Sequence, residues 1–494
     1  MGILDTPAYS QAAADAKFNR PNLNTMVSDG DSFDSKNRLV SPVIKVSGGA
    51  GTFAITVDGS TTSDLAYNAS TATVQTAVAA LASVGTGNVT VSGTAGASYS
   101  LTMISTAAQK GDLVSATGAG GATVRVDKSY SNSAQGIMSW VNVLTRQRLK
   151  YYGPKGVFGS TSDTFVSRFD TNIKPLNPGW VVLTSPCSND VASSTSAATI
   201  QTRLTQYMDK CAAIGARLII STIPPRNALT TAQRNVMSAV NRWIREQGQT
   251  RRGVYVVDAW QLLVDPTNGG FRSGVASDGV HLNGIGSQRV GAAIANIINT
   301  YSPPVDILGW GEDVELQAVM TNPNMTGTTG TLSNSITGQA ATSWTCQSLT
   351  GAAITAVASK VARTDFLPGE WQQVSVSAGE GCSIQQNLNF AGITPGTTYI
   401  DAMCEFQTDV DWANTTSFHM TIAFLDNAFA GVGASTDLQW VAGDTYDLVN
   451  TRPGSGVFRI PRVLVPAAAT KATVSVQMKG QGTLRVGRFG VFRS

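Results

Sequence analysis

The chain has 494 residues, of which 42% are hydrophobic and only 14% are charged, and its formal net charge is +3. This length is enough for about three domains of typical size, each with a core of its own. Lysine plus arginine (35) nearly balance aspartate plus glutamate (32) and form no basic block, which argues against a nucleic-acid partner. No apolar run approaches the roughly 18 residues of a membrane span, so we expect no membrane insertion.

Residues 1–23 are predicted to be an N-terminal lead-in or attachment segment. They lack the basic stretch followed by an apolar stretch that marks a secretory signal peptide. Glycine is abundant (49 residues), and serine and threonine are frequent, which is more typical of extracellular β-rich proteins than of cytosolic helical ones. An extracellular composition without an export signal therefore needs an explanation other than secretion.

The next segments predict a strand followed by an insertion. Residues 25–32 indicate a short buried strand that runs into a tight glycine turn. Residues 43–128 then change in character, with alternating strand patterns, an Asp58-Gly59 hairpin turn and an Ala/Val-rich helix over 70–81. This stretch is almost free of residues that carry chemistry, so it is predicted to be a small β-rich module with one helix.

From residue 133 the pattern becomes α/β. Three continuous apolar runs rich in β-branched residues indicate strands buried on both faces, at 180–184, 218–223 and 254–257. Apolar residues at helical spacing predict helices between and beside these strands, at 136–150, 199–214, 230–247 and 285–301. Strands that alternate with helices predict a parallel sheet with helices on both sides.

Residues 315–494 are predicted to form a C-terminal all-β sandwich, because short alternating strands are separated by Gly, Pro, Asn and Asp turns without a helical pattern. Its tryptophans Trp371, Trp412 and Trp440 are candidates for stacking on sugar rings, although a core position is the commoner place for a tryptophan.

The five cysteines are widely spaced and contain no CxxC pair, so neither a disulfide framework nor a zinc site is indicated. Isolated buried thiols are the preferred interpretation for Cys187, Cys211, Cys346, Cys382 and Cys404. With two histidines and no cysteine cluster, we expect neither a metal site nor a cofactor.

The two histidines are the sequence's candidates for a catalytic base. His419 lies in a strand-like stretch and is interpreted as structural. His281 lies in a polar, glycine-containing loop, and Asp278 precedes it by three residues, which allows its carboxylate to orient the imidazole. Alone, this pair is equally well explained as a surface turn. The Gly30-Asp31-Ser32 turn at the end of the first strand adds a possible nucleophile at a sheet edge where sites form.

The Gly-Asp-Ser turn near the N-terminus, followed later in the chain by the Asp-x-x-His pair, resembles the conserved sequence blocks of the SGNH hydrolases, or GDSL-type esterases. The resemblance implies a flavodoxin-like α/β domain, discontinuous over 24–42 and 129–304, with Ser32 as nucleophile, Asp278 and His281 completing a triad, and Ser32 also donating to the oxyanion. It implies that the other oxyanion donors are Asn189 and a glycine, for which Gly159 is preferred to Gly156. The sequence departs from the family's Gly-x-Asn-Asp block at Cys187, which replaces the glycine.

Parts of the chain outside these blocks resemble bacteriophage virion proteins. Residues 51–106 resemble a small module of tail proteins, the N-terminus resembles tail-fibre lead-ins, and the C-terminal segment resembles jelly-roll, carbohydrate-binding-like sandwiches. Together the resemblances imply a serine esterase that removes O-acetyl groups from a bacterial surface polysaccharide (O-antigen or capsule). They also imply a homotrimer in a virion tail, associated with other tail proteins and reaching the outside without a signal peptide. The alternatives are a non-catalytic receptor-binding fibre and a secreted bacterial polysaccharide acetylesterase.

Overall fold

A computed structural model describes residues 22–35, 38–103, 110–111, 113–304, 319–408, 415–439 and 455–493. The predicted lead-in up to residue 21, Trp412 and Trp440 lie outside these residues. The chain forms two compact units. The first, called the α/β unit, contains Met1–Ser35, Arg148–His281 and Asn296–Pro303; the second, called the β-rich unit, contains Lys36–Gln147, Leu282–Ala295 and Pro304–Ser494.

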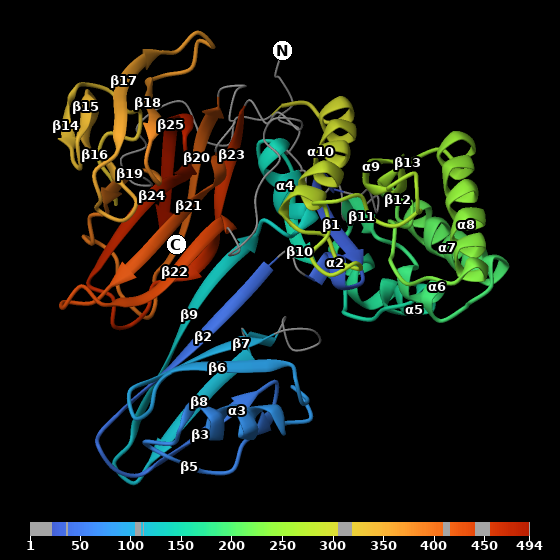
Figure 1. The fold of residues 1–494 in the computed structure, drawn as a ribbon, viewed down its shortest axis with the longest axis horizontal. Coiled ribbons are helices and arrows are strands. Elements are labelled where there is room, and N and C mark those ends of the chain that lie inside the picture. Colours follow the sequence, from blue (N-terminus) through green and yellow to red (C-terminus); the bar gives the residue numbers. More distant parts are fainter. Residues whose placement is uncertain are drawn as a thin grey trace, which may run out of the picture. The chain divides into compact units, whose positions relative to one another are not determined.

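A five-stranded parallel sheet organises the α/β unit (Figure 1). Its order is β10-β1-β11-β12-β13, and these strands span Lys150–Pro154, Asn22–Gly30, Pro178–Thr184, Arg217–Ser221 and Val254–Val257. Counted along the chain, the order is 2-1-3-4-5, the flavodoxin-like arrangement. The connections diverge on either side of β1, so the crevice beyond the ends of β1 and β11 is where such a sheet forms a site.

Helices cover both faces of this sheet, as the sequence predicts. Side chains of Val27, Val181 and Leu183 form one core with helices α5 (Ser162–Asn172), α7 (Ala197–Ala213) and α8 (Thr231–Thr250), drawn in green in Figure 1. On the opposite face, Tyr301 at the end of α10 (Gly284–Tyr301) contacts Tyr255, with ring centroids 4.7 Å apart. Every residue of β11 is buried, as expected for a central parallel strand.

The predicted helix over 136–150 is wrong in its second half. Helix α4 covers only Ile137–Leu144, and β10 already begins at Lys150. Arg146 and Gln147 have φ of 55° and 56°, in the left-handed region where an α-helix of L-residues cannot continue. The sequence also did not predict α5 or the short helices α2 (Ser32–Ser35), α6 (Ser188–Ala192) and α9 (Ala259–Leu263).

Within the β-rich unit, the inserted segment is a small β-rich module with one helix, α3 (Thr71–Ala79), as predicted. Its ends form a long antiparallel ladder, in which β2 (Arg38–Ser47) pairs with β9 (Thr123–Ser133). The remaining strands, β3 (Thr52–Val57), β4 (Ser60–Thr61), β5 (Leu65–Ala66), β6 (Val89–Thr94), β7 (Ser98–Met103) and β8 (Val114–Ala119), enclose a core that includes Phe53, Val74 and Tyr99.

The C-terminal region is built from two sheets that share one hydrophobic core. One sheet contains β14 (Thr329–Leu332), β16 (Ala340–Ser348), β19 (Gly381–Asn387), β24 (Lys471–Gly480), β21 (Thr415–Leu425) and β22 (Gly431–Gln439). The other contains β15 (Ile336–Gly338), β17 (Thr355–Ala362), β18 (Glu370–Ala378), β25 (Gly482–Arg493), β20 (Tyr399–Thr408) and β23 (Ser455–Leu464). No helix occurs in 319–408, 415–439 or 455–493, and Trp371 is buried with Arg363 stacked on its ring.

The first of these sheets continues into the inserted module. Strand β22 pairs in parallel with β9, which gives a ten-stranded sheet that ends at β6. At the junction, the buried Asp437 carboxylate accepts hydrogen bonds from Asn132 Nδ2 and the Arg459 backbone N–H, each 2.8 Å long. The structure thus groups residues 36–147 with the C-terminal strands. Of the helices in the described residues, none is both long and apolar enough to cross a membrane.

Candidate active site

The turn after β1 presents Ser32 at the first position of a short helix, α2 (Ser32–Ser35). Gly30 is required at this turn, because its φ is +151° and a Cβ there would lie 2.6 Å from the carbonyl oxygen of Thr184. The Asp31 carboxylate accepts a 3.0 Å hydrogen bond from the N–H of Phe33 and holds the turn closed.

The structure brings Ser32 together with a histidine 249 residues away. Oγ of Ser32 lies 2.8 Å from Nε2 of His281, and Nδ1 of His281 lies 2.7 Å from Oδ2 of Asp278. The other carboxylate oxygen of Asp278 accepts hydrogen bonds from the backbone N–H groups of Val280 (3.0 Å) and His281 (2.7 Å). The carboxylate and the imidazole, Asp278 and His281, thus both lie in one four-residue turn.

The pKa of Asp278 fixes the roles of the two imidazole nitrogens. Partial burial opposes ionisation, but the hydrogen bonds from His281 and the two backbone N–H groups lower the pKa of Asp278 to about 2. An ionised carboxylate can only accept, so Nδ1 carries the hydrogen of that bond and Nε2 is left to accept the proton of Ser32. This is the geometry of a Ser-His-Asp triad.

The two candidate glycines of the oxyanion hole differ in what occupies their N–H groups. The N–H of Gly156 donates a 2.7 Å hydrogen bond to Oδ2 of Asp34, and a Cβ at Gly156 would lie 2.4 Å from the Cβ of Asp34. Gly159 lies in the turn after it, its N–H has no acceptor in the described part of the chain, and a Cβ there would meet open space. Of the two glycines, Gly159 is therefore the one whose backbone N–H is available to donate to an oxyanion.

Asn189 lies in α6, directly after β11. Its Nδ2 donates to the carbonyl oxygen of Ser160 (3.0 Å) and lies 3.4 Å from Oδ2 of Asp31. The amide therefore lies beside the Gly159 turn and the turn that carries Ser32. Cys187, which replaces the glycine of the family's block, adopts φ 65° and ψ 15°, a left-handed conformation that glycine favours.

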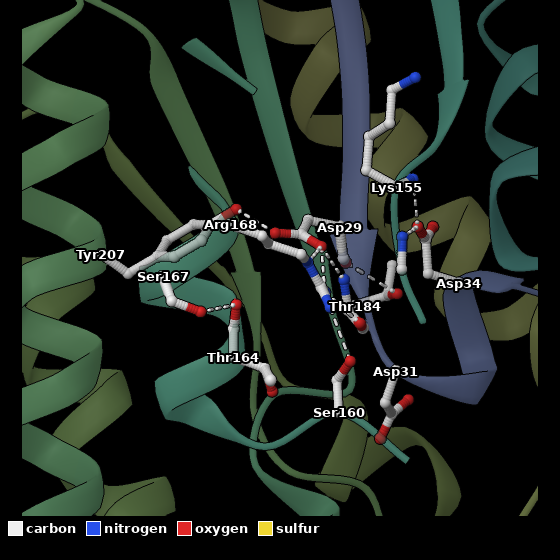
Figure 2. A network of polar contacts seen from close by, with 12 residues as sticks. Asp29, Asp31, Asp34, Lys155, Ser160, Thr164, Ser167, Arg168, Thr184 and Tyr207 are labelled. Atoms are coloured by element: carbon white, nitrogen blue, oxygen red, sulfur yellow. Dashed lines mark hydrogen bonds and ion pairs between the residues drawn. The ribbon is translucent and has the colours of Figure 1, made fainter. Parts of the chain in front are cut away.

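A buried network beneath the turn, which the sequence did not predict, ties these donors to the sheet (Figure 2). Arg168 of α5 forms an ion pair with the fully buried Asp29 and donates to the carbonyl oxygen of Gly30 and to Oγ of Ser160, at 2.6 Å each. The hydroxyl of Tyr207 donates to the other carboxylate oxygen of Asp29, at 2.9 Å. Arg168 thus joins the β1 turn to Ser160, whose carbonyl oxygen accepts the hydrogen bond from Asn189.

Two further carboxyl groups next to Ser32 are buried. Desolvation raises the pKa values of Asp31 and Asp34 to about 7, although each accepts hydrogen bonds from the backbone. The Asp34 carboxylate accepts from the N–H groups of Lys155 (3.1 Å) and Gly156 (2.7 Å), and so joins the β1 turn to the loop after β10 (Figure 2).

The other residues that the sequence analysis singled out lie elsewhere. His419 lies in β21 of the β-rich unit, where desolvation lowers its pKa to about 4. All five cysteines are buried and unpaired. No group of three or more His, Cys, Asp or Glu side chains in the described residues is arranged to hold a metal ion.

Residues 111–289 match the model of the GDSL-like Lipase/Acylhydrolase family, so the chain contains a GDSL-like acylhydrolase domain, a type of ester hydrolase. The match covers less than half of the chain and includes Gly159, Asn189, Asp278 and His281. Ser32 precedes it, on the other side of the inserted module. The five-stranded sheet and this match confirm the predicted SGNH-type α/β fold, and the two sheets of strands β14 to β25 confirm that the C-terminal region is β-rich.

Several solved structures are similar to part of the chain. A putative acylhydrolase from Bacteroides fragilis is 23% identical over 33% of this chain and 83% of its own, with a TM-score of 0.30. An acetyl-xylooligosaccharide esterase mutant from Geobacillus is 15% identical over 33% and 78%, with a TM-score of 0.29. The enzymatically active domain of bacteriophage CBA120 tailspike protein 4 is 18% identical over 31% and 20%, with a TM-score of 0.21. No curated protein matches the chain.

We expect Arg168→Met to destabilise the α/β unit by about 3–5 kcal/mol, because it leaves the Asp29 carboxylate buried without its cation. Hydrogen–deuterium exchange of peptides from β1 and β11 in increasing urea measures this unit separately. The control is Arg251→Met, which removes a surface ion pair with Asp209 and should cost less than about 1 kcal/mol. Equal losses in the two variants would contradict a special role for the buried pair.

The raised pKa of Asp34 predicts a pH dependence of stability. The native state keeps the proton up to about pH 7, whereas an unfolded aspartate loses it near 3.9, so stability falls as the pH rises between these values. Between pH 5 and 6.5, Asp34→Asn should make this fall shallower by about 1.4 kcal/mol per pH unit, measured by the same exchange experiment. An unchanged slope would contradict the prediction; the exposed Asp209→Asn is the control.

Proposed function

We propose that the α/β unit is a serine esterase that removes O-acetyl groups from a bacterial surface polysaccharide. The observation that carries the proposal is the continuous chain of contacts from Ser32 through His281 to Asp278, with spacings of 2.8 and 2.7 Å. In this proposal Ser32 is the nucleophile, His281 the general base and acid, and Asp278 the group that orients the imidazole.

The first half of the reaction forms an acetyl-enzyme. Oγ of Ser32 attacks the acetyl carbonyl carbon while its proton passes to Nε2 of His281, and the Asp278 carboxylate stabilises the resulting imidazolium. The carbonyl oxygen becomes an oxyanion, for which the N–H groups of Ser32 and Gly159 and the amide of Asn189 are the donors. The tetrahedral intermediate then expels the sugar oxygen, which takes the proton back from His281.

The second half returns the enzyme to its starting state. A water molecule gives a proton to Nε2 of His281 and attacks the acetyl carbon through the same oxyanion donors. The intermediate expels Oγ of Ser32, which recovers the proton, and acetate leaves.

Apolar side chains beside His281 support a bulky, weakly polar substrate such as a sugar ring. The ring of Phe158 is inclined by 30° to the imidazole, with centroids 6.3 Å apart, and Phe158 and its neighbour Val157 are 36% and 46% exposed. Exposed aromatic faces next to catalytic groups are suited to the apolar faces of sugars.

The proposed setting is a bacteriophage tail fibre or tailspike. It rests on the resemblance of the N-terminal, inserted and C-terminal segments to virion proteins, and the glycine-rich, weakly charged composition is consistent with it. In that setting the chain is a homotrimer attached to other tail proteins, its location is the virion tail, and its receptor is the O-antigen or capsule that it deacetylates.

Ser32→Ala should abolish acetate release, since a triad nucleophile is worth at least about 10⁴-fold in kcat. The measurement is enzymatic acetate determination with a panel of acetylated bacterial O-antigens and capsules and with a small phenyl acetate ester. The exposed Ser167→Ala, in α5, is the control and should leave the rate unchanged. Binding of a polysaccharide without acetate release from any substrate would instead favour the non-catalytic receptor-binding fibre.

Asn189→Ala should lower kcat by about 10²–10³-fold with little change in KM, because the amide donates mainly to the oxyanion of the transition state. Initial rates on the phenyl ester separate the two constants. Asn172→Ala, at the exposed end of α5, is the control. A rise in KM at constant kcat would place Asn189 in ground-state binding and contradict its proposed role.

A further inference from the structure

Arg226 is a cation at the edge of the candidate active site that the triad does not use. It lies in the loop after β12, at the carboxyl end of the parallel sheet, where Ser32 and Asn189 follow their own strands. Its Nη1 lies 3.4 Å from Oγ of Ser188 and 3.5 Å from Oδ1 of Asn189. The guanidinium therefore touches the amide that is proposed to bind the oxyanion.

Arg226 has no carboxylate partner among the described residues, and its Nε and Nη2 make no hydrogen bond there. Asp31 interacts with its charge without contacting it. Several other arginines of this unit form ion pairs with aspartates, namely Arg168, Arg203, Arg245 and Arg251. Arg226 is also only partly buried. It thus presents two donor nitrogens, on a guanidinium that contacts no carboxylate of the described residues, beside the candidate triad.

The loop that carries Arg226 is held in place. Two buried prolines, Pro224 and Pro225, precede the arginine and restrict the backbone of the segment that leads to it. The N–H of Asn227, which follows it, donates a 2.9 Å hydrogen bond to the carbonyl oxygen of Gly279, within the turn of Asp278 and His281. The guanidinium is therefore positioned in advance relative to the triad, which lowers the entropic cost of using it for binding.

We propose that Arg226 binds a carboxylate on the sugar that carries the acetyl group, so that the substrate is an acidic polysaccharide containing uronic or other carboxylate-bearing sugars. This inference rests on the proposed esterase function and adds its substrate class. A planar guanidinium matches a planar carboxylate in two parallel hydrogen bonds. Phe158, whose ring lies beside the imidazole of His281, and its exposed neighbour in sequence, Val157, offer apolar surface for the uncharged part of the sugar ring.

The test uses matched substrates that differ only in charge. An O-acetylated methyl galacturonoside is compared with its 6-carboxamide, which keeps the ester and the ring but removes the anion. The full-length wild type should prefer the carboxylate by about 10- to 100-fold in kcat/KM, the usual strength of a hydrogen bond to a charged group. The preference should decrease as salt is added.

Arg226→Gln should reduce the ratio of the two kcat/KM values to near one, mainly through a higher KM for the carboxylate. Arg226→Lys, which keeps the charge without the planar fork, should retain part of the preference. Arg251→Gln, at a surface ion pair away from the triad, should leave the ratio at its wild-type value. An acetylated glucose 6-phosphate serves as the second anion, and a larger preference for the phosphate would overturn the carboxylate assignment.

Two results would overturn the proposal as a whole. The wild type could cleave both galacturonoside substrates equally, or Arg226→Gln could slow both by the same factor, which would make Arg226 a positioning residue for Asn189 only. The absence of acetate release from these substrates and from the phenyl ester would instead refute the esterase function itself. The two failures are thus distinguishable.

Discussion

The buried ion pair between Asp29 and Arg168 is the interaction on which the candidate site depends. Asp29 is fully buried in β1, where a carboxylate without a partner would be costly, and Arg168 satisfies it together with Tyr207. The same guanidinium donates to the carbonyl of Gly30 and to the hydroxyl of Ser160, so this ion pair also holds two loops of the candidate site in place. Stability of the sheet and geometry of the oxyanion donors therefore have one common origin.

The site as a whole assembles from strand ends and short turns. Gly30 ends β1, and the Gly159 turn, Asn189 and the Asp278 turn come from other parts of the α/β unit. Backbone and buried side-chain hydrogen bonds hold these segments to their neighbours. Side chains placed in this way need little reorganisation when charge develops on a substrate oxygen, which is the usual source of catalytic power in ester hydrolysis. Arg226 extends the same edge of the sheet with a charge available for substrate.

Much of the α/β fold was predictable from local patterns. The buried runs at β11, β12 and β13 and the long amphipathic helices have periods that sequence alone displays. The Ser32, Asp278 and His281 pattern was visible because each has a polar, glycine-containing context. Strand β10 was missed because it follows α4 closely, and only the positive φ of Arg146 and Gln147, a tertiary effect, separates the two. The role of Arg168 was hidden for a similar reason, since it depends on a contact 139 residues away.

The ladder between β2 and β9 has a consequence for how such chains diversify. It brings the two ends of the inserted module together over ten residue pairs, from Arg38↔Asn132 to Ser47↔Thr123. A longer or shorter segment between these ends changes the entropy of closing the loop only slowly, so the pairing tolerates insertions of different length. The ladder thus marks a position at which one module can be exchanged for another of different size during evolution, without a change to the residues of the candidate site.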